Sequence, residues 1–179
     1  MIEAMSLHEA IFTTRAIRRF SQEPIPAGIL RQVLEAATQA PSGRNSQPWH
    51  FVVVQESEQK EILGTLYKEA FFENRPSEIN EPDSNSSVYL ARNLGKAAAI
   101  IAVCAPNSNP SGLGAIRTFA SIFPAIQNML LTARSLGLGG NITINHILRH
   151  EEIKESLKIP ADKQIIALIP MGYPGAPEK

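Results

Sequence analysis

The most informative segment of this chain runs Pro41-Ser42-Gly43-Arg44-Asn45-Ser46-Gln47-Pro48-Trp49. It is polar and lies between two prolines, and a run rich in β-forming residues, 51–55, follows it directly. The side chains of Ser42, Asn45 and Gln47 are of the kind that hydrogen-bond a heteroaromatic ring edge or a polyol. Taken alone, such residues are turn formers more often than ligands, and Trp49 is a core residue more often than part of a cofactor site. The segment predicts a loop that leads into a strand.

On the N-terminal side, Ser6 and Glu9 have the spacing of a capping box, which predicts a helix of about two turns. We expect this helix to end in a basic cluster, Arg15, Arg18 and Arg19. If the segment is helical, Arg15 and Arg18 share a face, and guanidinium groups bind phosphate through paired hydrogen bonds. Solvated surface arginines are the commoner explanation of such a cluster. Apolar residues at helical spacing over 29–37 predict a second helix, ended by Pro41.

The rest of the chain mixes helices and strands without strict alternation. Helices are expected over 62–70, over 119–133 with a start near 121–124 because of Pro124, and over 151–157. Gly137 is well placed to stop the second of these. Strands are expected over 97–105, 139–145 and 164–171, and polar loops over 73–87 and 106–114. These patterns indicate an α+β fold or a three-layer sandwich.

Composition excludes several classes of function. The chain has 179 residues, 44% of them hydrophobic, which fits one domain, 1–179, with a sizeable core. Lys+Arg and Asp+Glu both number 17, and this balance argues against nucleic acid or an anionic membrane as the main partner. The start has no apolar core of a secretory signal and no stretch is long enough to span a bilayer, so we expect a cytoplasmic protein. The single cysteine, Cys104, is expected to be a buried hydrophobe.

Simple catalytic and cofactor motifs are absent. Gly112-Leu113-Gly114 and Gly137-Leu138-Gly139 begin like a dinucleotide fingerprint, but both lack its third glycine and neither follows an obvious strand. The turn from Gly137 to Gly140 exposes backbone amides that could donate to a ligand, or it is a plain helix stop. The four histidines lack metal-ligand spacing, and no G-x-S-x-G occurs.

Four segments, taken together in order, resemble the nitroreductase family. They are Thr14-Arg15-Ala16-Ile17-Arg18-Arg19-Phe20, the block from Ala40 to Val54 with its P-S-x-x-N-x-Q-P-W pattern, the helix and glycine turn from Ala125 to Gly139, and the close Ile169-Pro170-Met171-Gly172-Tyr173-Pro174. The second is the most specific. The four span nearly the whole chain.

The resemblance implies a three-layer α/β/α sandwich of the nitroreductase type, an α+β fold with a central, mostly antiparallel sheet. It implies an interlocked homodimer with two FMN molecules at the interface, and NADH or NADPH as the electron donor. It also implies ping-pong reduction of a small-molecule electron acceptor, with nitroaromatics and quinones as test acceptors. No catalytic side chain is demanded, because the flavin carries the electrons.

The site residues that the resemblance implies come from both subunits. Arg15 and Arg18 would hold the FMN phosphate and ribityl chain, with Ala16 between them. The backbone of Leu138, Gly139 and Gly140 would lie against the isoalloxazine. From the other subunit would come Pro41, Ser42, Gly43, Asn45 and Gln47. Arg92 or Asn93, just before the buried strand, would add a polar contact.

Three departures from the family bear on cofactor affinity and substrate range. Ala16 stands where the family often has serine, which removes a hydroxyl contact. The sequence ends at Lys179, from which we expect no firm phosphate contact, where many relatives continue. The lid is expected to be small and to come from 73–87 or 106–114. Two alternatives therefore stay open, a non-catalytic FMN carrier or flavin sensor on the same fold, and a cofactor-free structural relative.

Overall fold

Strand β2 (Ala99–Pro106) lies at the centre of the molecule and is buried along nearly its whole length. In the computed structural model, which describes residues 5–107 and 112–175, β2 pairs with β1 (His50–Val54) on one side and with β4 (Lys163–Gly172) on the other. The short strand β3 (Gly139–Gly140) completes the order β1-β2-β4-β3. All three pairings are antiparallel, as predicted for the central sheet.

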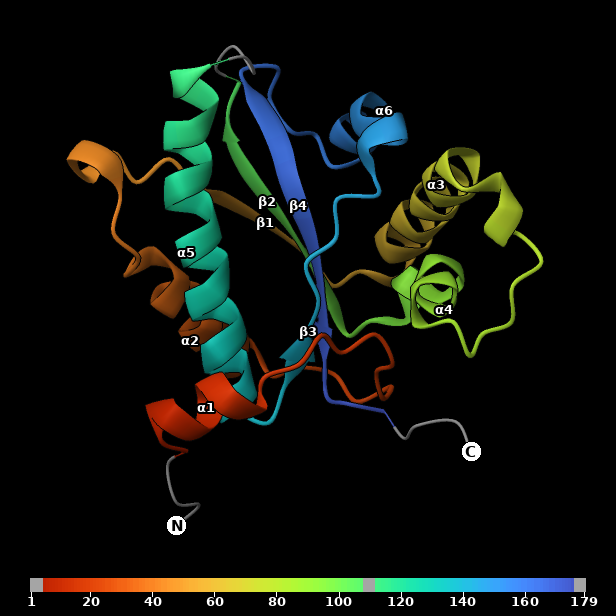
Figure 1. The fold of residues 1–179 in the computed structure, drawn as a ribbon, viewed down its shortest axis with the longest axis horizontal. Helices are drawn as coiled ribbons and strands as arrows, with labels where there is room; N and C mark the ends of the chain where they lie inside the picture. The colour runs from red at the N-terminus through yellow and green to blue at the C-terminus, as the bar shows by residue number, and fades with distance from the viewer. Residues whose placement is uncertain (1–4, 108–111, 176–179) are drawn as a thin grey trace.

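Each face of the sheet is covered by helices, so the fold has three layers (Figure 1). Alternate residues of β2 point to opposite faces. Ile101 and Val103 pack with α2 (Ala27–Thr38) and α5 (Leu113–Ser135), whereas Ile100 and Ala102 pack with the layer that holds α3 (Ser57–Asn74) and α4 (Ser86–Asn93). Because helices cover both faces of the sheet, nearly every residue of β2 is buried, which explains its continuous run of apolar residues. The α/β/α sandwich is confirmed.

The remaining elements are short. Helix α1 (Leu7–Thr13) packs on α5, and α6 (His150–Ser156) lies on the α3 side. Single 3₁₀ turns occur at η1 (Gly43–Asn45), η2 (Pro76–Glu78), η3 (Leu94–Lys96) and η4 (Ile147–Arg149). The buried Trp49 belongs to the core between the sheet and α2 and α5, as expected.

Two helices differ from the sequence prediction. Helix α5 begins at Leu113, well before the expected start, and continues through Pro124. The proline removes the hydrogen bond to the carbonyl of Ala120, but Ala120 is exposed, so water can replace the lost donor. Helix α4 lies where no helix was expected, capped by the Asn85 side chain, which accepts from the backbone N–H of Ser87 at 3.1 Å.

The segment that carries Arg15 and Arg18 is extended, so the prediction that they share a helical face is wrong. Helix α1 ends at Thr13, and Thr14 has an extended backbone. The hydroxyls of both threonines donate to carbonyls of the last turn, to Glu9 O at 2.7 Å and Ala10 O at 2.6 Å. These bonds satisfy the end of the helix and leave the following residues free to pair elsewhere.

The expected strand over 139–145 is also shorter than predicted. Only Gly139 and Gly140 form a ladder with β4, and Thr143 adds a single bridge to Leu168. Only part of the loop expected at 106–114 belongs to the described residues, and Lys179 lies outside them. Within the described part of the chain, no helix is long and apolar enough to cross a membrane. A cytoplasmic location stays a prediction.

Candidate functional site

A short bridge between two distant segments organises the most promising site. Ala16 pairs in parallel with Gly140, and the Ile17 N–H donates to the Gly140 carbonyl at 3.0 Å. The pairing draws the extended N-terminal segment onto β3. Arg15 is thereby placed beside the glycine turn, although about 120 residues separate the two in the sequence.

The glycine turn itself is set by the end of α5. Gly137 has a φ of 80°, and its N–H donates to Arg134 O at 3.1 Å while the Leu138 N–H donates to Ala133 O at 2.8 Å. This pair of bonds is a Schellman motif, which confirms Gly137 as the helix stop. Leu138, Gly139 and Gly140 then leave the helix in a fixed direction and are buried.

Gly139 has to be glycine because of the N-terminal segment. A Cβ at this position would lie 2.5 Å from Cγ1 and 2.8 Å from Cβ of Ile17. At Gly140, a Cβ would lie 3.0 Å from a methyl of Leu130. The absence of a Cβ at these glycines therefore allows Ile17 and Leu130 to pack against the backbone of the turn.

Two adjoining cavities, which we together call the bridge cavity, open beside this pairing. One, of about 270 Å³, is lined by Arg15, Leu138, Gly139 and Gly140. The other, of about 320 Å³, is lined by Arg15, Ala16 and Gly140. The structure thus brings together five of the predicted site residues: Arg15, Ala16, Leu138, Gly139 and Gly140.

The bridge cavity has the chemistry that a phosphorylated, partly aromatic cofactor needs. Arg15 and Arg134 line it together with the apolar Leu130 and Leu138, and no carboxylate does. The Arg15 guanidinium is steadied by the carbonyls of Phe12 at 3.0 Å and Thr14 at 2.7 Å. Two arginines suit a phosphate, and an apolar wall suits a planar ring. These residues fit FMN.

Arg18 faces a different set of groups. Its charge acts on the phenol of Tyr67, a buried residue whose hydroxyl lies 2.7 Å from Thr143 Oγ1 and accepts from Asn145 Nδ2 at 3.2 Å. Burial raises the pKa of Tyr67, and these hydrogen bonds and the Arg18 charge oppose that rise. Tyr67, Thr143 and Asn145 were missed by sequence reasoning. The available signal was the i, i+2 spacing of Thr143 and Asn145 directly after the glycine turn.

The loop 41–47 lies at the other end of α5 (Figure 1). Its Gly43 N–H donates to Ser121 Oγ at 3.4 Å, on the N-terminal half of α5, whereas Leu130 and Arg134 of the bridge cavity lie on the C-terminal half. Along the helix, Ser121 and Arg134 are about 20 Å apart at a rise of about 1.5 Å per residue. Within one chain, Pro41, Ser42, Gly43, Asn45 and Gln47 therefore do not meet Arg15.

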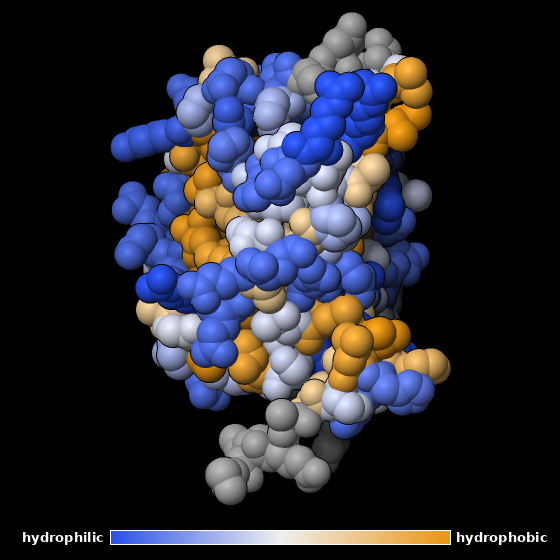
Figure 2. Space-filling view, turned by 90° about the vertical axis from the view of Figure 1, so that its left-hand side faces the viewer, coloured by the Kyte–Doolittle hydropathy of each residue, from blue (hydrophilic) through white to orange (hydrophobic). Residues whose placement is uncertain are grey.

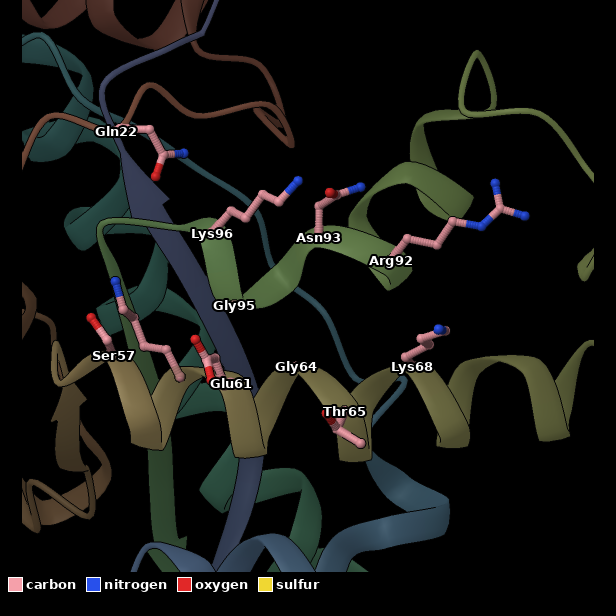
Figure 3. Close-up of a pocket in the computed structure, with 11 residues that line it drawn as sticks. Gln22, Ser57, Glu61, Gly64, Thr65, Lys68, Arg92, Asn93, Gly95 and Lys96 are labelled. Atoms are coloured by element: carbon pink, nitrogen blue, oxygen red, sulfur yellow. The ribbon is translucent and has the colours of Figure 1, made fainter.

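Arg92 lies in yet another place. It lines a groove of about 560 Å³ between α3 and the α4–η3 segment. Figure 3 shows Arg92, Asn93 and Lys96 on one side of this groove and Ser57, Glu61 and Lys68 of α3 on the other. The Arg92 guanidinium binds the Asp83 carboxylate and donates to Ile79 O at 2.9 Å. The size of this groove does not make it the active-site candidate, because Arg92 is already paired and none of the bridge residues reaches it.

The histidines and the cysteine offer no further chemistry. Burial lowers the pKa of His146 to about 4 and raises that of the Cys104 thiol to about 11, so the imidazole is neutral and the thiol protonated at pH 7. The rings of His146 and His150 stack at 5.8 Å. In residues 5–107 and 112–175, no group of three His, Cys, Asp or Glu side chains could hold a metal ion.

Comparisons with known proteins agree with this architecture. The sequence model of the nitroreductase family matches residues 11–173. YfhC of Bacillus subtilis, provisionally named an NAD(P)H nitroreductase, is 29% identical over 96% of this chain and 87% of its own length.

Two solved structures have the same fold. One is oxidised iodotyrosine deiodinase bound to FMN and 3-iodo-L-tyrosine, with a TM-score of 0.79, 22% identity and coverage of 97% of this chain and 92% of the other. The second is a mutant form of NfnB, an FMN- and NADPH-dependent nitroreductase from a Sphigopyxis strain. Its TM-score is 0.78 at 18% identity, over 97% and 91% of the two chains.

Proposed function

Because this chain belongs to the nitroreductase family, we propose that it is an FMN-dependent NAD(P)H oxidoreductase that reduces small acceptors such as nitroaromatics or quinones. The observation that carries the proposal is the bridge cavity, where Arg15 and the buried glycine turn meet. A bound flavin would supply the redox chemistry, the transfer of electrons from NADH or NADPH to a small acceptor.

The chain's own residues have binding and orienting roles in this proposal. Arg15 and Arg134, which line the bridge cavity, would hold the FMN phosphate, and the backbone from Leu138 to Gly140 would border its ring. Arg18 does not line this cavity, and its charge acts on Tyr67. Arg15 and Arg134 would place positive charge beside a bound flavin, and positive charge there favours the anionic reduced form.

The active unit is proposed to be a homodimer in which each flavin contacts both chains. In one chain, the loop that carries Ser42 and Asn45 lies against the N-terminal half of α5, whereas Arg15 lies near its C-terminal half. We propose that Ser42 and Asn45 reach the flavin from a second copy. Large apolar side chains exposed on the surface support such an interface. They are Leu7, Ile11 and Phe12 on α1, Leu113, Ile116, Phe119 and Phe123 on α5, and Ile142, Ile144 and Ile147 after β3. Figure 2 shows apolar patches on the side of the molecule that carries α1 and α5.

An anaerobic absorbance spectrum of the purified protein, before and after NADH or NADPH is added, tests the reaction. We expect a flavin spectrum that bleaches with at least one donor. A spectrum that persists with both would favour a carrier or sensor, and a protein that stays colourless after soaking with FMN would remove the cofactor proposal. Parallel double-reciprocal lines at several acceptor concentrations are expected for a ping-pong reaction, and converging lines would contradict it.

Two single variants test the shared site. Arg15→Ala should weaken FMN binding, whereas Arg31→Ala, on the exposed face of α2, should not. Inactive Arg15→Ala and Asn45→Ala proteins, mixed and refolded, should regain part of the activity, since some heterodimer sites contain neither substitution. Heterodimers that form without activity would contradict the two-chain site.

A further inference from the structure

We propose that Arg44 and Arg117 form an oxyanion site that holds a carboxylate or phosphate of the substrate beside the flavin. The bound anion could come from either of two molecules. It is a carboxylate on the acceptor, or it is the 2′-phosphate that distinguishes NADPH from NADH. The location beside the flavin rests on the proposed function. The anion site itself rests on the contacts below.

The two arginines come together from different elements. Arg44 lies in η1 and Arg117 in the first half of α5, and both line one cavity of about 330 Å³, which we call the loop cavity. Ser46, Thr118 and Ser121 add hydroxyl groups to its wall. No carboxylate lines it. The Thr118 and Ser121 hydroxyls already donate to Gly114 O and Arg117 O, so the two guanidinium groups are the donors that match an oxyanion.

Neither guanidinium has a partner among the residues that the structure describes. Three other arginines form ion pairs: Arg31 with Glu35, Arg92 with Asp83, and Arg149 with Glu69 and Glu73. Two like charges at one cavity repel each other, and an anion between them removes that repulsion. The loop cavity therefore holds two cations that no carboxylate among the described residues compensates.

A buried hydroxyl ties the two arginine-bearing segments together. Ser121 is 3% exposed, and its Oγ donates to the Arg117 carbonyl at 3.2 Å and accepts from the Gly43 N–H at 3.4 Å. Gly43 directly precedes Arg44. Ser121 is thus a positioning residue that fixes the η1 loop against the turn of α5 that carries Arg117.

The backbone of the loop is held in an unfavourable conformation. Arg44, Asn45 and Gln47 have φ values of 56°, 54° and 43°, which non-glycine residues seldom adopt. The Gln47 N–H donates to Ser42 Oγ at 3.0 Å, and Gln47 Nε2 donates to Asn45 Oδ1 at 3.0 Å. Such strain persists where surrounding contacts impose it and is concentrated at ligand sites. It presets the direction in which Arg44 leaves the loop.

The loop cavity has a place in the proposed reaction. Ser42 and Asn45, in the same loop, are the residues proposed to reach the flavin of the second copy. An anionic group held by Arg44 and Arg117 would therefore belong to a molecule that lies against that flavin. Arg44 and Arg117 would select charged acceptors or donors without taking part in the electron transfer.

Direct binding to the purified protein tests the site, with or without flavin turnover. Two matched pairs of probes serve, benzoate with benzamide and 2′-AMP with adenosine, each titrated by calorimetry. In the unmodified protein, the anionic member of at least one pair should bind more tightly. That preference should fall about tenfold in Arg117→Ala and in Arg44→Ala, since about 1.4 kcal/mol corresponds to a factor of ten. Arg31→Ala should keep it.

The arms of the experiment identify the source of the anion. A preference for benzoate assigns the site to the acceptor, and a preference for 2′-AMP assigns it to the donor. The kcat/KM ratio of 4-nitrobenzoate to 4-nitrobenzamide, or of NADPH to NADH, should fall in parallel in the two variants. No preference in either pair, or a preference that survives the loss of both arginines, overturns the proposal. A protein that prefers the anion but never bleaches its flavin refutes the proposed function and leaves the anion site standing.

Discussion

Replacing Gly139 by alanine tests how the N-terminal segment is held on the sheet. The new Cβ would lie 2.5 Å from Cγ1 and 2.8 Å from Cβ of Ile17. A change of rotamer moves Cγ1 away but leaves Cβ in place, because the Ile17 backbone is fixed by its hydrogen bond to Gly140. Relief therefore requires the segment to shift as a whole, and Arg15 moves with it.

The expected cost is at the upper end of the range for overpacking, about 2 to 3 kcal/mol of unfolding free energy. Gly28→Ala is the matched control. Gly28 lies in the first turn of α2, and no atom outside its neighbours comes within 4 Å of a Cβ there. Because alanine is the better helix former, this control should be neutral or more stable by up to about 1 kcal/mol.

Urea unfolding of both variants measures the difference, and a fluorescence titration with FMN measures the consequence for the bridge cavity. We expect Gly139→Ala to lose both stability and FMN affinity, while Gly28→Ala keeps both. If Gly139→Ala unfolds at the same urea concentration as the unmodified protein, the N-terminal segment does not dock on β3 as described. A loss of stability with unchanged FMN affinity would separate the docking from cofactor binding.

Three further predictions concern buried polar groups. His146 has a folded pKa of about 4 and an ordinary value of 6.5, so only the unfolded state takes up its proton between these pH values. Between pH 7 and pH 4, the unfolding free energy of the unmodified protein should therefore fall by about 3 kcal/mol more than that of His146→Gln, as measured by urea titration. An equal fall in the two proteins would contradict this. Tyr67→Phe removes the hydrogen bonds that the Tyr67 hydroxyl makes with Thr143 and Asn145, and it should cost about 1 to 2 kcal/mol of unfolding free energy by the same assay. Cys104, buried and with a raised pKa, should react with a thiol reagent only after denaturation, and rapid labelling of the native protein would refute its burial.

The sequence alone was enough for most of the helices and strands, because hydrophobic periodicity is a local property. The buried run at β2, the helical spacing of α2 and the stop at Gly137 were each predicted within a few residues of their final positions. Errors arose where tertiary packing overrode local preference. The α5 stripe, Ile122, Ile126 and Met129 among its members, carries the helix through Pro124.

The candidate site was predicted only in part. The resemblance to the family named individual residues, but it did not show which of them lie together within one chain. It named Arg15, Ala16 and the glycine turn, which the Ala16–Gly140 bridge does bring together. It also named Arg92, which Asp83 holds in a separate groove. It missed Tyr67, since nothing in the sequence of α3 shows that its hydroxyl meets Thr143.

The sequence by itself determined most of the helices and strands and the types of side chain that they carry. It did so through hydrophobic spacing, helix caps and turn residues, which act over a few positions. The tertiary structure decided which distant residues share a cavity. Ala16 pairs with Gly140, and the Gly43 backbone pairs with Ser121. Both pairings join segments that are distant in the sequence, and no local pattern predicts them. Such contacts form only when the burial of both faces of the sheet has fixed where each segment lies.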